Sequence, residues 1–166
     1  EKKFMAKFPN AMSPDFLIGG PPCQGNSNLN NHSRRKDSRT KLYLSMVRAA
    51  IVLKPELVII ENVRDVIKSE GKEVEKAVKQ FEKMGYYTSS EVLCGRDFGV
   101  AQDRYRHFLI ASKKSVPDFS IIETFRLKQP RTLKWAIHDL KDKLQTEGEF
   151  NSTTKTPNQL NKDRMQ

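Results

Sequence analysis

The chain has 166 residues, 37% of them hydrophobic, and a formal net charge of +10. Its length suits one domain with its own core and leaves little room for a second domain of the commonest size, about 100 to 150 residues, while the basic excess favours a polyanionic partner such as nucleic acid. The two cysteines and three histidines are scattered, which argues against a disulfide framework or a metal site, and no apolar run approaches the roughly 20 residues that cross a membrane.

The first part of the chain predicts a strand, a long loop, a helix and a second strand. Residues 1–14 contain two prolines and are interpreted as an irregular lead-in. The apolar run 16–18 predicts a short strand of the kind that is buried on both faces. Residues 24–41 are polar throughout and too long for an ordinary connection, which is typical of a functional loop. A helix is predicted at 42–53, ended by the proline that follows, and a second buried strand at 57–60.

The second part adds an amphipathic helix and two further strands. Residues 72–84 place apolar side chains on one side and charged ones on the other, which predicts a helix. Strands are predicted at 86–93 and 106–111, close enough in sequence to pair as a hairpin. The alternation of strands and helices predicts an α/β fold with a mostly parallel sheet and a terminal antiparallel pair. A last helix is predicted at 133–144, and the few apolar side chains of residues 145–166 indicate a flexible tail or a linker.

Two of the predicted strands end beside reactive side chains. Cys23 follows the first strand through a Gly-Gly-Pro-Pro turn, and Glu61 and Asn62 follow the second strand directly. Because ligands bind beyond the carboxyl ends of strands in open α/β sheets, we expect the thiol and the carboxyl group to face one cleft. A thiolate nucleophile with a nearby general acid would then allow a covalent mechanism. The alternative, a buried structural cysteine and an ordinary surface glutamate, is left equally open by the spacing alone.

A pair of arginines is the third candidate feature. Arg104 and Arg106 lie two positions apart, so in extended backbone their side chains point to the same face. Two guanidinium groups in this arrangement could hold a carbonyl group, a phosphate or the surroundings of the nucleophile. Each arginine taken singly is more often a solvated surface residue.

Together these stretches resemble the cytosine-C5 DNA methyltransferases. The sequence Gly-Gly-Pro-Pro-Cys-Gln at 19–24 is similar to the nucleophile motif of that family, Glu-Asn-Val at 61–63 to its Glu-Asn-Val motif, and Gln-Asp-Arg-Tyr-Arg at 102–106 to its Gln-x-Arg-x-Arg motif. The resemblance covers roughly residues 15–112, in the order and spacing of the family. It implies part of the Rossmann-like fold of S-adenosylmethionine-dependent methyltransferases. We expect four segments in chain order: a lead-in at 1–14, the catalytic half of the methyltransferase domain at 15–112, a helical extension at 113–144 and a flexible tail or linker at 145–166.

The resemblance implies transfer of a methyl group from S-adenosylmethionine to C5 of a cytosine flipped out of double-stranded DNA, without a metal. Cys23 would attack C6 of the base, Glu61 would interact with N3, and Arg104 and Arg106 would complete the catalytic set. A further set of residues is expected to bind the substrate, either through the family motifs or through the basic loop: Pro22, Gln24, Asn62, Gln102, Arg34, Arg35 and Arg39. Pro21 is expected near the cofactor, whose other contacts are unknown.

The cofactor segment of the family, of the Asp-Leu-Phe-x-Gly-x-Gly type, has no counterpart in residues 1–14. After residue 113 there is no room for the usual target recognition domain. We therefore expect a fragment or one part of a split enzyme, inactive until a second chain or a missing segment supplies the cofactor half. The nucleophile strand would then carry an unpaired, apolar edge.

Other functions stay open at this point. The main alternative is a catalytically silent module, derived from the same scaffold, that binds nucleic acid or regulates. Retention of Cys23, Glu61, Arg104 and Arg106 together favours the enzyme. An unrelated thiol hydrolase is disfavoured because no histidine lies near either strand end in the sequence. We expect an intracellular protein of restriction and modification, cytoplasmic and associated with the nucleoid if the source is bacterial.

Overall fold

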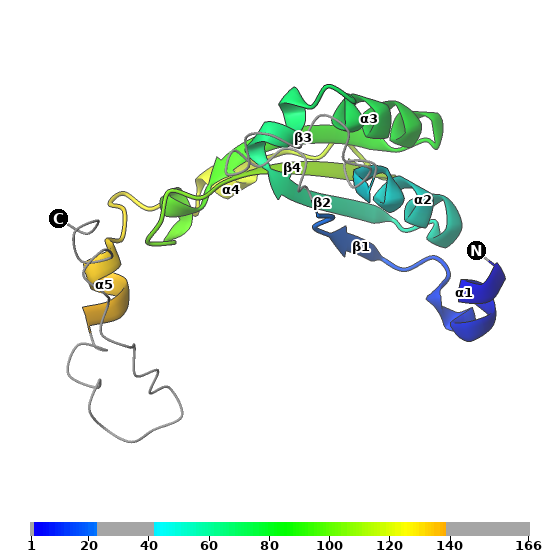
Figure 1. Ribbon diagram of the computed structural model, residues 1–166, viewed down its shortest axis with the longest axis horizontal. Coiled ribbons are helices and arrows are strands. Elements are labelled where there is room, and N and C mark those ends of the chain that lie inside the picture. The colour runs from blue at the N-terminus through cyan, green and yellow to red at the C-terminus, as the bar shows by residue number, and fades with distance from the viewer. Residues whose placement is uncertain (1, 23–41, 139–166) are drawn as a thin grey trace, which may run out of the picture. The chain divides into compact units, whose positions relative to one another are not determined.

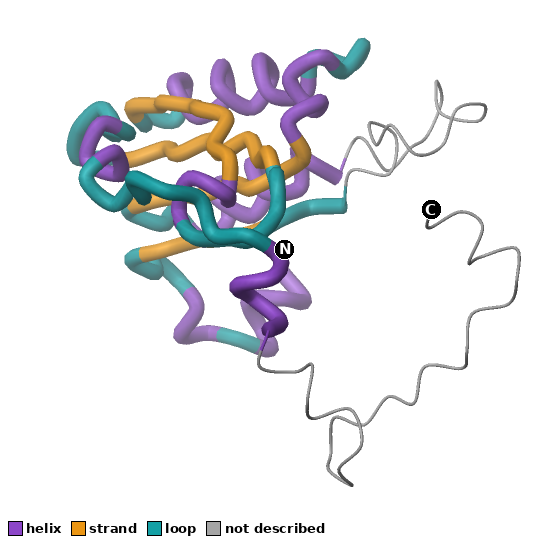
Figure 2. Tube along the Cα trace, turned by 90° about the vertical axis from the view of Figure 1, so that its left-hand side faces the viewer, coloured by secondary structure: helices purple, strands orange, loops and turns teal. Residues whose placement is uncertain are grey.

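The computed structural model of the protein describes residues 2–22 and 42–138. The chain divides into two compact units, Glu1–Pro130 and Arg131–Gln166. The first unit contains a four-stranded sheet, and two helices cover one face of it (Figure 1). The same layering can be followed from the side in Figure 2.

The sheet is mixed. Its strands are β1 (Phe16–Gly19), β2 (Leu57–Val63), β3 (Tyr87–Cys94) and β4 (Tyr105–Ser112), in the spatial order β1-β2-β4-β3. The β1 and β2 strands are parallel, and β4 runs antiparallel to both of its neighbours. The predicted α/β fold is confirmed, as are all four predicted strands and the antiparallel pairing of the last two. Three strands share one direction, and β4 lies against them between β2 and β3.

Two long helices supply the other side of the core. They are α2 (Tyr43–Leu53) and α3 (Glu73–Lys83), within the ranges that the sequence predicts. The α2 helix ends at Lys54, whose backbone is left-handed (φ 52°) ahead of Pro55. The core consists of apolar side chains from these helices, the central strands and the turns that join them: Tyr43, Val47, Ala50, Val58, Ile60, Val66, Ala77, Phe81, Tyr86, Leu109 and Ala111.

The ends of the described chain differ in part from the prediction. The lead-in is not irregular throughout, because it forms the short helix α1 (Lys2–Lys7) and the 3-10 turn η1 (Pro9–Ala11). The six residues of α1 include no glycine, proline or β-branched residue, and a proline at the start of a helical turn sacrifices no hydrogen bond. The short helix α4 (Ser120–Glu123) is not predicted by the sequence. In the second unit, α5 (Leu133–Ile137) opens the predicted helix 133–144, of which residues from 139 onward lie outside the described part.

The β1 strand lies at the edge of the sheet and is covered on one face only. In the described ranges it pairs with β2 alone. Phe16 and Ile18 are 64% and 68% exposed, whereas Leu17 between them packs against the core. The prediction of a strand buried on both faces is therefore wrong for β1. The cause is that α2 and α3 both lie on the face to which Leu17 points, so apolar side chains on the opposite face have no cover among the described residues.

Candidate active site

Two of the predicted catalytic side chains meet at one end of the sheet. Glu61 lies near the end of β2, and Arg106 lies at the start of the antiparallel strand β4. The Nε atom of Arg106 is 2.8 Å from Oε1 of Glu61, and its Nη1 atom donates a hydrogen bond of 2.8 Å to the carbonyl of Tyr105. The two charged side chains are 38% and 23% exposed, for glutamate and arginine respectively. The pair is therefore partly shielded from solvent but still accessible to a ligand.

The Gly-Pro-Pro turn that leads to Cys23 lies beside this pair. The β1 and β2 strands pair in parallel, with Gly19 opposite Ile60. The turn that follows Gly19 therefore begins alongside Glu61. A Cβ atom on Gly20 would lie 3.0 Å from Oε2 of Glu61, so the glycine leaves room for the carboxylate. Pro21 is half-buried and Pro22 is exposed at the end of the described segment.

Asn62 fixes this turn to β2. Its side chain is 3% exposed, and its Nδ2 atom donates a hydrogen bond of 3.0 Å to the carbonyl of Pro21. Its Oδ1 atom accepts one of 2.9 Å from the backbone N–H of Val63. Both ends of the buried amide are therefore paired, and the turn that leads to Cys23 is tied to the strand that carries Glu61.

The structure describes some of the remaining predicted residues and not others. Gln102 and Arg104 are exposed and belong to the connection between β3 and β4. The carbonyl of Arg104 accepts a hydrogen bond of 2.8 Å from the N–H of Gly95, which closes the base of this connection. The other predicted residues lie outside the described ranges: Cys23, Gln24, Arg34, Arg35 and Arg39.

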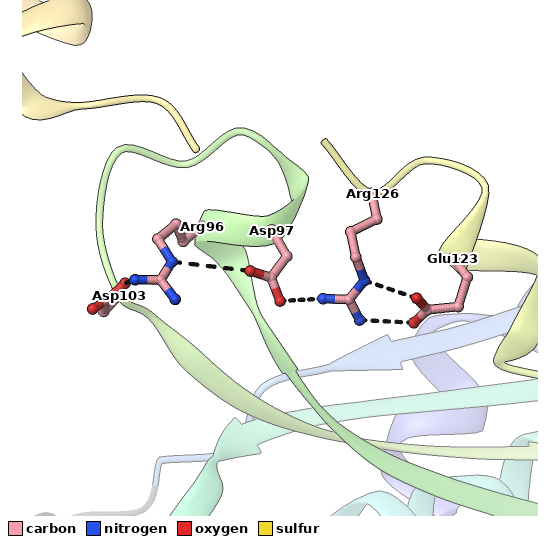
Figure 3. Close-up of polar contacts among 5 residues, drawn as sticks. All are labelled: Arg96, Asp97, Asp103, Glu123 and Arg126. Carbon is pink, nitrogen blue, oxygen red and sulfur yellow. Dashed lines mark hydrogen bonds and ion pairs between the residues drawn. The ribbon is translucent and has the colours of Figure 1, made fainter. Parts of the chain in front are cut away.

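Charged side chains in the β3–β4 connection and after β4 form a network of ion pairs, here called the chain of charges, which the sequence did not predict. Arg96 pairs with Asp103 at 2.9 Å and lies 3.9 Å from Asp97, whose other oxygen pairs with Arg126 (Figure 3). Arg126 also donates two hydrogen bonds of 2.7 Å to Glu123. These bonds lower the pKa of the Glu123 carboxyl group and raise the pKa of Arg126. The network ends at Asp103 and Glu123, which lie far apart in the sequence, so no local sequence pattern could have indicated it.

His107 is a second feature that the sequence did not indicate. It lies on β4 opposite Asn62, is 1% exposed, and has no hydrogen-bond partner for either ring nitrogen among the described residues. Burial lowers its pKa, because the charged form loses its hydration. The imidazole is therefore part of the packing next to Asn62.

Residues 2–22 and 42–138 include neither a membrane-spanning helix nor a metal-binding cluster. None of the helices there is long and apolar enough to cross a membrane. No group of three or more His, Cys, Asp or Glu side chains in those ranges could hold a metal ion.

The sheet order and the placement of the Glu61–Arg106 pair define part of an α/β domain of the methyltransferase class. The family model "C-5 cytosine-specific DNA methylase" matches residues 1–166. The chain belongs to this family.

Individual relatives agree with the family assignment. The chain is 39% identical over 126 residues to the type II methyltransferase M1.BsuMI of Bacillus subtilis (strain 168), and 34% identical over 131 residues to M.FnuDI of Fusobacterium nucleatum. These alignments cover 76% and 77% of this chain but only 30% and 38% of the two relatives. The chain thus spans about a third of the length of these relatives.

Solved structures give the same fold. A putative DNA modification methyltransferase encoded within an E. coli prophage matches with a TM-score of 0.62 and 30% identity, covering 82% of this chain and 38% of that one. The Dnmt2 methyltransferase of S. pombe matches with a TM-score of 0.57 at 22% identity, covering 92% of this chain and 47% of that one. The second match bears on the fold alone.

Proposed function

We propose that this chain is the catalytic part of a DNA (cytosine-5)-methyltransferase. The enzyme would transfer a methyl group from S-adenosylmethionine to C5 of a cytosine flipped out of double-stranded DNA, through a covalent adduct between Cys23 and C6. The observation that carries the proposal is the Glu61–Arg106 pair, 2.8 Å apart, next to the turn that Asn62 holds in place. Family membership supports it independently.

Glu61 is suited to hold the base because Arg106 orients its carboxylate by binding one of the two oxygens. Arg106 engages Oε1, while Oε2 faces the space that Gly20 leaves open. In the proposed mechanism Glu61 interacts with N3 of the cytosine and makes the ring electrophilic. Arg106 holds the carboxylate and lies near the base, and Arg104 supports the pocket. An oriented carboxylate needs no reorganisation when charge develops on the ring.

The proposed covalent step uses the Cys23 thiolate. The sulfur would form a bond with C6, and the electron pair of the C5–C6 double bond would then attack the methyl group of S-adenosylmethionine. With S-adenosylhomocysteine as the other product, the C5 proton would be lost to a base, and the C6–S bond would break to restore the double bond and free Cys23. The turn that Asn62 ties to β2 would hold the start of the nucleophile segment during these steps.

DNA binding is proposed for the basic surroundings of the site. Flipping a base costs a few kcal/mol of stacking and pairing, which protein contacts must offset. Phosphate contacts are proposed for Arg34, Arg35 and Arg39, in keeping with the net charge of +10. Contacts with the flipped nucleotide and its surroundings are proposed for Pro22, Gln24 and Gln102. Asn62 is 3% exposed and paired at both ends of its amide, so it is proposed to act by holding the turn and not by touching the nucleotide. An enzyme of this kind would work in the cytoplasm, on the nucleoid if the source is bacterial.

Pro21 is proposed to lie near S-adenosylmethionine, and no other described residue is assigned a contact with it. We propose that a second chain, or a further segment, supplies the cofactor half along the edge of β1 that pairs with no other strand among the described residues. Two observations support this: the edge strand exposes Phe16 and Ile18, and the relatives M1.BsuMI and M.FnuDI are about three times as long as the aligned segment. Alone, the chain would be inactive.

Trapping tests the proposed function directly. The chain is mixed with S-adenosylmethionine, the cofactor-binding part of a relative such as M1.BsuMI, and a duplex that carries 5-fluorocytosine. Fluorine at C5 cannot leave as a proton does, so the adduct accumulates and can be detected by denaturing electrophoresis. An adduct that Cys23→Ser abolishes supports the enzyme. Unimpaired DNA binding without an adduct under any complementation would instead favour the silent module.

A further inference from the structure

The connection between β3 and β4 is a compact loop that closes on itself. It begins with the 3-10 turn η4 (Gly95–Phe98) and ends at Arg104. The N–H of Gly95 donates to the carbonyl of Arg104 at 2.8 Å, and the N–H of Val100 donates to the carbonyl of Gly95 at 3.0 Å. A Cβ on Gly95 would lie 3.2 Å from Val100, so the two arms of the loop are in close contact. A shift of one arm therefore moves the other.

Asp97 attaches this loop to the chain segment after α4 at two points. Its side chain pairs with the Nη1 atom of Arg126, and its carbonyl accepts a hydrogen bond of 2.8 Å from the N–H of Leu127. One contact joins two side chains and the other joins two stretches of main chain. A movement of residues 126–127 away from η4 would therefore break both contacts. Leu127 lies 30 positions beyond Asp97, so the attachment is tertiary, not local.

Arg126 is held in the orientation that this attachment requires. Its Nε and Nη2 atoms donate to the two oxygens of Glu123 at 2.7 Å, which leaves Nη1 directed at Asp97 (Figure 3). The central carbon Cζ of the guanidinium group lies over the ring of Phe98, 5.5 Å from its centre. A planar group with five donors can make all these contacts at once, whereas an ammonium group cannot.

The chain of charges ends beside the proposed DNA contacts. Arg96 links Asp97 to Asp103, and Asp103 lies between Gln102 and Arg104 in the sequence. The network contains three carboxylates and two guanidinium groups, so its own charge is −1 in a chain of net charge +10. A network with a net negative charge is not attracted to DNA phosphates, which favours a role within the protein.

We propose that Arg126 and Asp97 are positioning residues, which fix the β3–β4 connection so that Gln102 and Arg104 are presented to the DNA in one arrangement. The proposal rests on the proposed function for the part that concerns DNA. An exposed ion pair contributes little to stability on its own. Here the loop, the segment 126–127 and Glu123 are joined in one network, so a side chain that one contact has already ordered loses less entropy when it makes the next. The structure thus assigns a role to a segment that lies outside the three family motifs.

Hydrogen exchange and kinetics test the proposal together, with Arg126→Gln and Asp97→Asn as variants and Arg126→Lys as the conservative one. The control is Glu56→Gln, which breaks an ion pair of similar exposure, 3.3 Å from Lys113, at the far end of β4. In the full chain, we expect amide exchange at Val100 and Leu127 to rise roughly two- to fivefold in both variants, and exchange at Lys113 to stay the same. In Arg126→Lys, the exchange rates at Val100 and Leu127 should lie between those of the two other variants and those of the unaltered chain.

Kinetics in the complemented enzyme separate positioning from simple loss of folded protein. A poorly positioned loop raises KM for DNA, by roughly three- to tenfold, with a smaller change in kcat, whereas loss of folded enzyme lowers kcat alone. Unchanged exchange, or faster exchange with an unchanged KM, overturns the proposal. An inactive unaltered enzyme contradicts the proposed function instead, and the exchange rates then decide whether the network fixes the loop.

Discussion

Glu61 and Arg106 come from strands that run in opposite directions, yet their side chains meet 2.8 Å apart because β2 and β4 are direct neighbours. In the register, Arg106 lies opposite Val63, two positions beyond Glu61 and on the same face of the sheet. The carboxylate is thus fixed by two strands of the sheet and not by a loop. A site built on strands holds its geometry better than one built on loops.

Removal of either partner of this pair should abolish most of the methyl transfer. In the complemented enzyme, Glu61→Gln should lower kcat by about two to four orders of magnitude, the usual contribution of a positioned acid or base. Arg106→Met should have a similar effect, because the carboxylate would lose its oriented partner. The measurement is single-turnover methylation of a short duplex. Glu56→Gln, at the other end of the same strands, is the matched control and should retain full activity.

Two substitutions of Asn62 separate its two hydrogen bonds. Asn62→Asp keeps an oxygen to accept from the N–H of Val63 but cannot donate to the carbonyl of Pro21, whereas Asn62→Ala removes both bonds. We expect Asn62→Ala to lower the free energy of unfolding by about 1–3 kcal/mol, because buried polar groups are left without partners. Denaturant unfolding provides the measurement.

Trapping on 5-fluorocytosine should then distinguish stability from positioning. Both variants should form the Cys23 adduct more slowly than the unaltered chain, since both release the turn. Fast adduct formation by Asn62→Asp would contradict the view that the bond to Pro21 positions the nucleophile segment.

The sequence was sufficient to predict most of the local structure. Short apolar runs with turn residues at their ends indicate strands, and apolar side chains at helical spacing that stop before Pro55 or Gly85 indicate α2 and α3. Adjacency of β1 and β2 followed from the single helix between them, because parallel neighbours need such a crossover. The proximity of Glu61 to the turn after β1 is a consequence of that pairing.

Features that depend on tertiary contacts could not be predicted. No local pattern indicates that β4 lies between β2 and β3, or that Arg126 returns to Asp97. Exposure of Phe16 and Ile18 follows from which face the helices cover, and an apolar run alone does not encode that choice. The placement of Cys23 lies outside the described residues and stays a prediction.

Stability should depend on pH through His107. Burial lowers the pKa of this side chain in the folded protein, whereas the unfolded chain keeps the ordinary value of 6.5. The unfolded state therefore binds protons more readily, so the contribution of His107 is complete above about pH 6.5 and is lost as the pH falls toward the lower, folded pKa. Urea unfolding measured between pH 5 and 8, a range that includes the ordinary pKa of histidine, should show this slope. His107→Leu should remove it, whereas substitution of the exposed His138 by Ala should leave it unchanged.

Phe81 should be the most sensitive apolar position of the described core. It is fully buried on α3 and packs edge-to-face against Tyr86, with ring centres 5.7 Å apart. Phe81→Ala should lower the free energy of unfolding by about 3–5 kcal/mol, from lost burial and the cavity that remains. Phe125 is 68% exposed, so Phe125→Ala should change stability by less than about 0.5 kcal/mol. Comparable losses in the two variants would argue against the assigned core.

The exposed apolar face of β1 should govern both self-association and complementation. Ile18→Thr removes apolar surface from a side chain that is 68% exposed, so it should leave stability within about 0.5 kcal/mol. We expect this variant to aggregate less than the unaltered chain when alone, because less apolar surface is exposed on the uncovered face of β1. It should also require more of the cofactor-binding part to reach half of the maximal adduct yield. Ile121→Thr is the matched control, since Ile121 is 64% exposed but lies on α4 and not on β1, and should change neither property. Equal effects of the two substitutions would mean that the cofactor half does not dock on β1.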